Sequence, residues 1–171
     1  MASLKRIRFW LAVFIVGLVL SGVTAFPLTW EVGLLVRWFG QGESGLALWL
    51  RTVHTGLVET DQRFPFLAYG TDWLAFAHLV IAVAFIGPWR DPVRNIWVIE
   101  FGLIACAMVL PLALIAGPLR GIPLGWCLLD CSFGVVGAIP LWLIRREILR
   151  LDSGKGVAAD KEPGPFNPPV G

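Results

Sequence analysis

The chain has 171 residues, of which 57% are hydrophobic and 15% are charged, and its formal net charge at pH 7 is +2. Soluble domains average about 45–50% apolar and 25% charged residues, so this composition argues against a soluble domain and favours a membrane protein. So small a net charge gives no support for nucleic-acid binding, and we expect none. The three cysteines all lie in apolar segments, which does not indicate a secreted disulfide framework.

The first apolar run covers residues 9–26 and follows a basic N-terminal segment. About 20 apolar residues cross the hydrocarbon core of a bilayer, so this run has roughly the length of one span. The alternative is a secretory signal peptide with residues 23–25, VTA, as its cleavage site. We favour a retained transmembrane helix, because the apolar run extends as far as Phe26.

Residues 27–71 mix aromatic, charged and apolar side chains, unlike the run before them. The glycine-rich residues 40–45 predict a turn between two amphipathic stretches, at residues 29–39 and 45–59. We therefore expect two short amphipathic helices here, which lie in the membrane interface or cap the bundle.

Three more apolar segments follow at residues 72–86, 96–117 and 122–144, separated by short turns. Each is expected to span the membrane. Pro111 lies inside the third of the four predicted spans and is expected to kink it, because proline has no backbone N–H to donate.

The sequence therefore predicts an all-α fold, an integral membrane four-helix bundle over residues 1–151. The two amphipathic helices are expected to form an extracytoplasmic cap, residues 27–71, in the first loop between spans. From residue 152 the chain is rich in glycine, proline and charge and has no apolar period. Residues 152–171 are accordingly predicted to be a disordered cytoplasmic tail.

Basic residues gather at one end of the predicted bundle, whereas the other end has four widely spread arginines. The positive-inside rule therefore places both termini in the cytoplasm. The compact loops and the lack of a eukaryotic targeting pattern favour a bacterial inner membrane. The basic residues at the cytoplasmic end are Lys5, Arg6, Arg8, Arg90, Arg94, Arg145, Arg146, Arg150 and Lys155.

Three ionisable residues, His78, Glu100 and Asp130, lie inside predicted spans. An acid at mid-helix costs roughly 2.5–3.5 kcal/mol on insertion scales, so each needs a partner or a function. His78 and Asp130 lie at similar depths, about 8 Å and 12 Å from the outer ends of their helices, and each shares a face with small residues. We expect these faces to meet, with the side chains joined directly or through one water. Such a pair could bind a metal, relay protons or fasten two helices.

Glu100 lies near the cytoplasmic end of its span, where four arginines are also expected. An ion pair with one of them is the simplest explanation, and we favour it over a role in transport. The four candidates are Arg90, Arg94, Arg145 and Arg146.

Cys127 and Cys131 have a C-x-x-x-C spacing, which matches neither the redox C-x-x-C motif nor a zinc site, so we expect them to pack as small residues. His54 and His78, the two histidines, are the candidate ligands of a haem held by two imidazoles. Against this, His54 lies beside Arg51 on the polar side of its helix and is expected to be solvated. We find no nucleotide-binding, zinc-protease or nucleophile motif, so no catalytic residues are predicted and the balance is against an enzyme.

Three functional classes remain open. We favour an accessory or interaction subunit without enzymatic activity, whose partners are the lipid bilayer and other membrane subunits or a second copy of the chain. The first alternative is a small transporter or proton pathway that uses His78 and Asp130. The second is a membrane redox protein with a bound cofactor. The sequence identifies no substrate and no particular cofactor.

Overall fold

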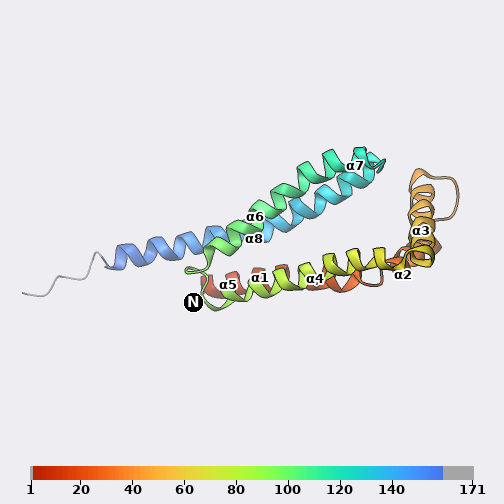
Figure 1. Ribbon diagram of the computed structural model, residues 1–171. Helices are drawn as coiled ribbons and strands as arrows, with labels where there is room; N and C mark the ends of the chain where they lie inside the picture. Colours follow the sequence, from red (N-terminus) through yellow and green to blue (C-terminus); the bar gives the residue numbers. More distant parts are fainter. Residues whose placement is uncertain (1, 160–171) are drawn as a thin grey trace, which may run out of the picture.

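The computed structural model describes residues 2–159, with side chains described for residues 3–152. Every regular element in this part of the chain is helical, as the composition predicts (Figure 1). In chain order the elements are α1 (Ala2–Ala25), α2 (Leu28–Phe39), α3 (Gly45–Arg63), η1 (Pro65–Leu67), α4 (Ala68–Ala84), α5 (Ile86–Arg90), α6 (Ile96–Pro111), η2 (Leu112–Ala116), α7 (Gly117–Leu119) and α8 (Leu124–Ala159).

Four helical stretches are long and apolar enough to cross a membrane: Ser3–Ala25, Pro65–Arg90, Ile96–Leu119 and Leu124–Asp152. They coincide with the four predicted spans, and each is longer than the apolar run that predicted it. Hydrophobicity alone underestimates their length, because a hydrogen-bonded helix continues through polar flanking residues until a cap or a turn ends it.

The four long helices are arranged as two packed pairs. α1 packs against α4, and α6 packs against α8, while α1 also contacts α8. The pairs lie together at the end that carries the N-terminus and diverge toward the opposite end, where α2 and α3 extend from the α1–α4 pair (Figure 1). The fold is therefore a bundle that is closed at one end and open at the other.

The closed end is held by a cluster of buried apolar side chains from both pairs. Leu11 on α1 and Leu141 on α8 are fully buried there, together with Phe85 at the end of α4. Because dispersion contacts need close packing, this cluster is where the two pairs adhere. Its members are Ile7, Leu11, Phe85, Val98, Ile99, Leu141, Ile144 and Ile148.

Within each pair, glycines allow the helices to approach closely. A Cβ atom added to Gly22 of α1 would lie 2.9 Å from the backbone oxygen of Ala75 on α4. A Cβ atom added to Gly134 of α8 would lie 2.6 Å from the backbone oxygen of Cys106 on α6. Small residues at helix contacts let backbones pack at short range, which is the main source of helix association in lipid.

Replacing Gly134 by alanine should therefore destabilise the α6–α8 pair by about 1–3 kcal/mol, because the backbone of α6 blocks the new methyl group. Gly125 on the same helix has no neighbour within 4 Å, so Gly125→Ala is the matched control and should be neutral or slightly stabilising. Reversible unfolding in mixed detergent micelles, followed by helicity, measures both. Equal losses for the two variants would contradict the packing described.

The segment between the first two long helices is a helical hairpin of α2 and α3. Ser44 caps α3, and its hydroxyl accepts a hydrogen bond from the Ala47 N–H at 3.2 Å. Arg51 reaches back from α3, and its Nη1 donates to the carbonyl oxygens of Gly40 at 2.5 Å and Gly42 at 3.0 Å. Gly42 has a φ angle of +85°, which other residues rarely adopt. These bonds fix the turn between the two helices.

The turn between the second and third predicted spans, residues 87–95, is shorter in the structure, because α5 continues through Trp89 and Arg90. Pro88 lies in the first turn of α5, where a backbone N–H has no partner within the helix, so it does not end the helix. Asn95 closes the remaining loop, since its Nδ2 donates to the carbonyl oxygens of Gly87 at 3.2 Å and Asp91 at 2.8 Å.

Pro111 produces the irregularity expected in the third long helix, in the form of a π-helical turn. α6 ends at Pro111 and continues as η2, one π turn, and then as α7. A proline cannot donate to the carbonyl one turn back, and a local change to wider hydrogen bonding accommodates this.

The beginning of the predicted disordered tail is helical in the structure, because α8 continues through Asp152 to Ala159. Extending an existing helix adds one hydrogen bond per residue, and no proline occurs between Pro140 and Pro163. The rest of the predicted tail, residues 160–171, lies outside the described residues.

Candidate functional site

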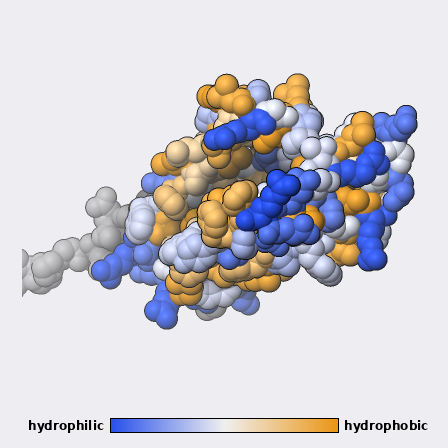
Figure 2. All heavy atoms as spheres, turned by 45° about the vertical axis from the view of Figure 1, so that its right-hand side comes forward, coloured by the Kyte–Doolittle hydropathy of each residue, from blue (hydrophilic) through white to orange (hydrophobic). Residues whose placement is uncertain are grey.

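A cavity with a volume of about 710 Å³ lies between the two helix pairs, and α1, α4, α6 and α8 all contribute to its walls. We call it the inter-pair groove. Its lining is mainly apolar, and within the described part of the chain His78 is the only histidine or acidic residue that lines it. Figure 2 shows that hydrophobic side chains also cover much of one outer face of the molecule, with hydrophilic patches between them.

Four glycines line the inter-pair groove, and they differ in what surrounds them. A Cβ atom on Gly102 would lie 2.8 Å from Leu141 Cδ1, and one on Gly137 would lie 3.2 Å from Cys106 Sγ. The third, Gly134, contacts α6 as described above. Gly17 on α1, by contrast, has nothing within 4 Å. Gly17 therefore faces the open part of the groove, where a side chain from another molecule could fit.

His78 is half-buried on the α4 wall of the groove. Its ring Nδ1 lies 2.7 Å from the carbonyl oxygen of Leu74 on the same helix. A carbonyl oxygen only accepts, so we assign the proton of the neutral ring to Nδ1, which leaves Nε2 as an acceptor. The hydrogen bond to its own helix satisfies one ring nitrogen without any residue from another helix.

Asp130 is half-buried on α8 and does not line the groove. Within the described residues its carboxylate forms no hydrogen bond or ion pair. The expected direct bond between His78 and Asp130 is therefore absent from the structure. The small-residue faces of the two helices do pack, but against different neighbours: Ala75 of α4 meets Gly22 of α1, and Gly134 of α8 meets Cys106 of α6.

These positions also bear on the predicted metal site. In the part of the chain that the structure describes, no three His, Cys, Asp or Glu side chains come together. His78 and Asp130, the candidate ligands, thus lack a third protein ligand of these types. A zinc site normally needs three or four.

Glu100 forms the type of ion pair that the sequence predicts. Of the four candidate arginines, Arg145 on α8 is the partner, with its Nε 3.0 Å from Glu100 Oε1. The side chain of Glu100 is 44% exposed and that of Arg145 is 40% exposed, so this is a partly solvated ion pair between α6 and α8. Arg146 instead lies over the ring of Trp142, at 5.6 Å from its centroid.

Glu100→Gln should lower the free energy of unfolding by about 0.2–1 kcal/mol, the usual range for exposed pairs. A charge swap, Glu100→Arg with Arg145→Glu, should restore most of what Glu100→Arg alone removes. Arg146→Glu is the matched control and should restore nothing, because Arg146 does not contact Glu100. Detergent-unfolding midpoints of these variants measure the effect, and equal rescue by both arginine variants would contradict a specific pair.

The sequence did not predict a role for Glu147, although it forms the densest polar contacts in the described structure. Its side chain on α8 is only 14% exposed. It accepts a hydrogen bond from Ser3 Oγ at 2.7 Å and lies 3.5 Å from Arg6 Nη1 and 3.3 Å from Arg150 Nη1. It was overlooked because it follows the predicted end of the span, where charged residues are usual. The available signal was its spacing of three residues from Arg150.

All three cysteines are free thiols. Cys127 and Cys131 are buried, and Cys127 Sγ packs against Gly117 and donates to the Ile122 carbonyl oxygen at 3.8 Å. Cys127 therefore lies at the contact between α8 and the end of the third long helix. Packing explains their small size and burial, as predicted from their spacing.

His54 is half-buried, not fully solvated as expected, because Gly33 on α2 leaves room for it. A Cβ atom on Gly33 would lie 3.1 Å from His54 Nε2. His54 thus packs within the α2–α3 hairpin, while His78 lines the inter-pair groove. The structure does not bring the two imidazoles together as a pair of haem ligands, which must face one another across the iron.

Comparisons of the chain with models of protein families, with curated proteins and with solved structures gave no match.

Proposed function

We propose that this chain is an integral membrane protein with four spans that acts as an accessory or interaction subunit. In this proposal the inter-pair groove receives a transmembrane helix of a partner membrane protein. The protein would lie in a bacterial inner membrane with both termini in the cytoplasm. The observation that carries the proposal is the groove itself, an apolar cavity of about 710 Å³ between two diverging helix pairs.

The lining of the groove suits a helix. Helices in lipid associate where glycine and alanine allow backbones to approach, and Gly17 and Ala105 both line the groove. Gly17 has no neighbour within 4 Å, so its backbone is accessible to a partner. A lipid chain is the other possible occupant, but it gains no particular advantage from an exposed glycine.

The transport alternative has less support. A proton path needs successive ionisable groups, and the described residues place one histidine, His78, and no acid on the groove wall. Asp130 lies outside the groove, and Glu100 is paired with Arg145. The redox alternative would require ligands for a cofactor, and His54 and His78 are not arranged as a facing pair.

A photo-crosslinking amino acid at Phe133 tests the proposal, because this side chain lines the groove and is 67% exposed. Irradiation of native membranes should give a discrete protein adduct. Gly17→Leu should abolish the adduct by filling the groove, and a Cβ atom at this position has no neighbour within 4 Å in this chain. Gly125→Leu is the matched control, since Gly125 also has no neighbour within 4 Å but does not line the groove.

The control should keep the adduct at full yield, and both leucine variants should unfold at the same detergent concentration as the parent. An adduct with twice the mass of the chain would identify the partner as a second copy. Adducts to lipid alone, or a protein adduct that Gly17→Leu leaves unchanged, would refute the proposal.

Reporter insertions test the proposed orientation. The cluster of basic residues implies that reporters within residues 91–95 and after Gly171 are cytoplasmic. A reporter inserted at Gly42, in the turn between α2 and α3, should be extracytoplasmic. A phosphatase that is active only outside the cytoplasm and a fluorescent protein that folds only inside it give opposite signals at each site. A cytoplasmic Gly42 would rule out the orientation.

A further inference from the structure

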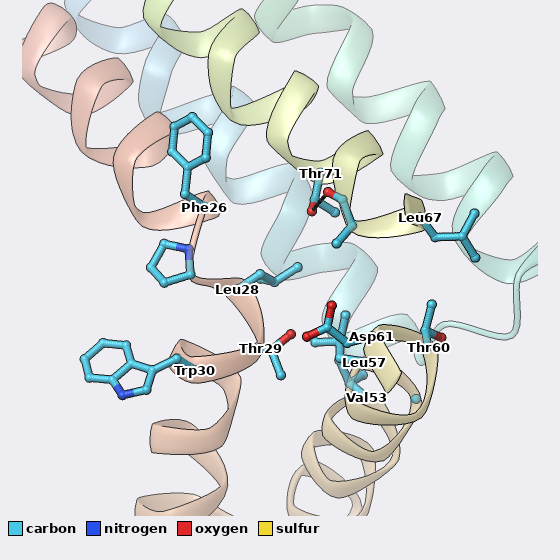
Figure 3. A pocket seen from close by; sticks show the side chains of 13 residues that line it. Phe26, Leu28, Thr29, Trp30, Val53, Leu57, Thr60, Asp61, Leu67 and Thr71 are labelled. Carbon is cyan, nitrogen blue, oxygen red and sulfur yellow. Dashed lines mark hydrogen bonds between the residues drawn. The ribbon is translucent and has the colours of Figure 1, made fainter. Parts of the chain in front are cut away.

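A second cavity, separate from the inter-pair groove, lies at the open end of the molecule. It has a volume of about 570 Å³ and is enclosed by the corner between α1 and α2, by α3, and by the beginning of α4. We call it the cap pocket. Its lining includes the polar side chains of Thr29, Thr60, Asp61 and Thr71 (Figure 3).

The carboxylate and the three hydroxyls that line the cap pocket can all accept hydrogen bonds, and together they carry one negative charge. Among the residues that the structure describes, Asp61 is the only charged one that lines it, alongside the hydroxyls of Thr29, Thr60 and Thr71. Within the described residues, the Asp61 carboxylate has no hydrogen bond or ion pair. Thr71 Oγ1 donates to the Ala68 carbonyl oxygen at 2.6 Å, so its lone pairs remain as acceptors.

These groups are close to one another in space. Figure 3 shows the Asp61 carboxylate pointing from α3 toward Thr29 at the start of α2, below the first turn of α4 that carries Thr71. A ligand at Asp61 could therefore also reach hydroxyls from neighbouring elements. No lysine or arginine of residues 3–152 lines the pocket, so an anionic ligand would meet repulsion and no compensating charge there.

The remaining walls of the cap pocket are apolar. Leu28, Val53 and Leu57 lie around its base, and Phe26 and Leu67 flank it. The pocket adjoins the ends of two membrane-length stretches, which finish at Ala25 and begin at Pro65. The pocket therefore offers both apolar and polar surface, which suits a molecule with a hydrocarbon part and a polar head.

We propose that the cap pocket binds a primary ammonium group attached to a hydrocarbon chain. The ammonium has three donors, which match the Asp61 carboxylate and the threonine hydroxyls, and its charge complements the unpaired acid. A divalent metal fits less well, because it requires several anionic or carbonyl ligands and the pocket offers one carboxylate. The ammonium can belong to the headgroup of an aminophospholipid or to a free alkylamine, and both present the same chemistry.

Calorimetric titration of the full-length protein in micelles of a non-ionic maltoside detergent tests the proposal, with hexylammonium as the probe. 1-Hexanol is the uncharged control, and titrations into protein-free micelles are subtracted. Hexylammonium should bind to one site, and hexanol should bind at least about tenfold more weakly, because only the charged probe forms charge-assisted hydrogen bonds.

Asp61→Asn should weaken hexylammonium binding about tenfold or more, since it removes the charge while keeping the size of the side chain. Glu59→Gln is the matched control, because it removes one negative charge from the same exposed surface of α3 outside the pocket. It should change the affinity less than about twofold. Helicity of both variants should equal that of the parent, which separates loss of the site from loss of the fold.

Addition of phosphatidylethanolamine or phosphatidylglycerol to the micelles identifies the source of the ammonium. Competition by phosphatidylethanolamine alone assigns the pocket to a lipid headgroup, and competition by neither lipid assigns it to a free amine. The proposal is overturned if hexylammonium does not bind, if hexanol binds equally well, or if Glu59→Gln weakens binding as much as Asp61→Asn.

Discussion

Adhesion between the two helix pairs depends on one apolar cluster, centred on Leu11, Phe85 and Leu141. Because this cluster lies at one end, the pairs are joined there and separate toward the other end (Figure 1). Glu147 reinforces the same end by linking Ser3 and Arg6 of α1 to α8. The inter-pair groove follows from this arrangement, because it lies where α1, α4, α6 and α8 separate.

The four long helices could be predicted from the sequence because the length of an apolar run is a local property of the chain. The α2–α3 hairpin was predictable for the same reason, from a glycine-rich turn between two amphipathic stretches. The helix ends were not predictable from hydrophobicity. The second predicted span ends at residue 86, but α5 continues through Pro88 to Arg90, and α8 extends past Asp152 where composition indicated disorder.

The candidate site was less predictable, because partner choice depends on which helix faces meet. Counting residues gave His78 and Asp130 similar depths, but depth does not determine the direction in which a side chain points around its helix. The sequence left four arginines as possible ion-pair partners of Glu100. Only the packing of α6 on α8 selects Arg145 among them. Asp61 and Glu147 were overlooked since both lie outside the predicted spans, where acids are common.

The joint between the pairs also has a mechanical consequence. Covalently, α4 and α6 are connected only by α5 and the short loop that Asn95 closes. From Leu141 in the cluster to Leu124 at the open end, α8 rises about 26 Å, at roughly 1.5 Å per residue. A tilt of α8 by about 5° about the cluster displaces its far end by about 2 Å, which is more than the rise of one residue along a helix. Small adjustments of side-chain packing at the closed end are thus amplified into changes in the width of the open end.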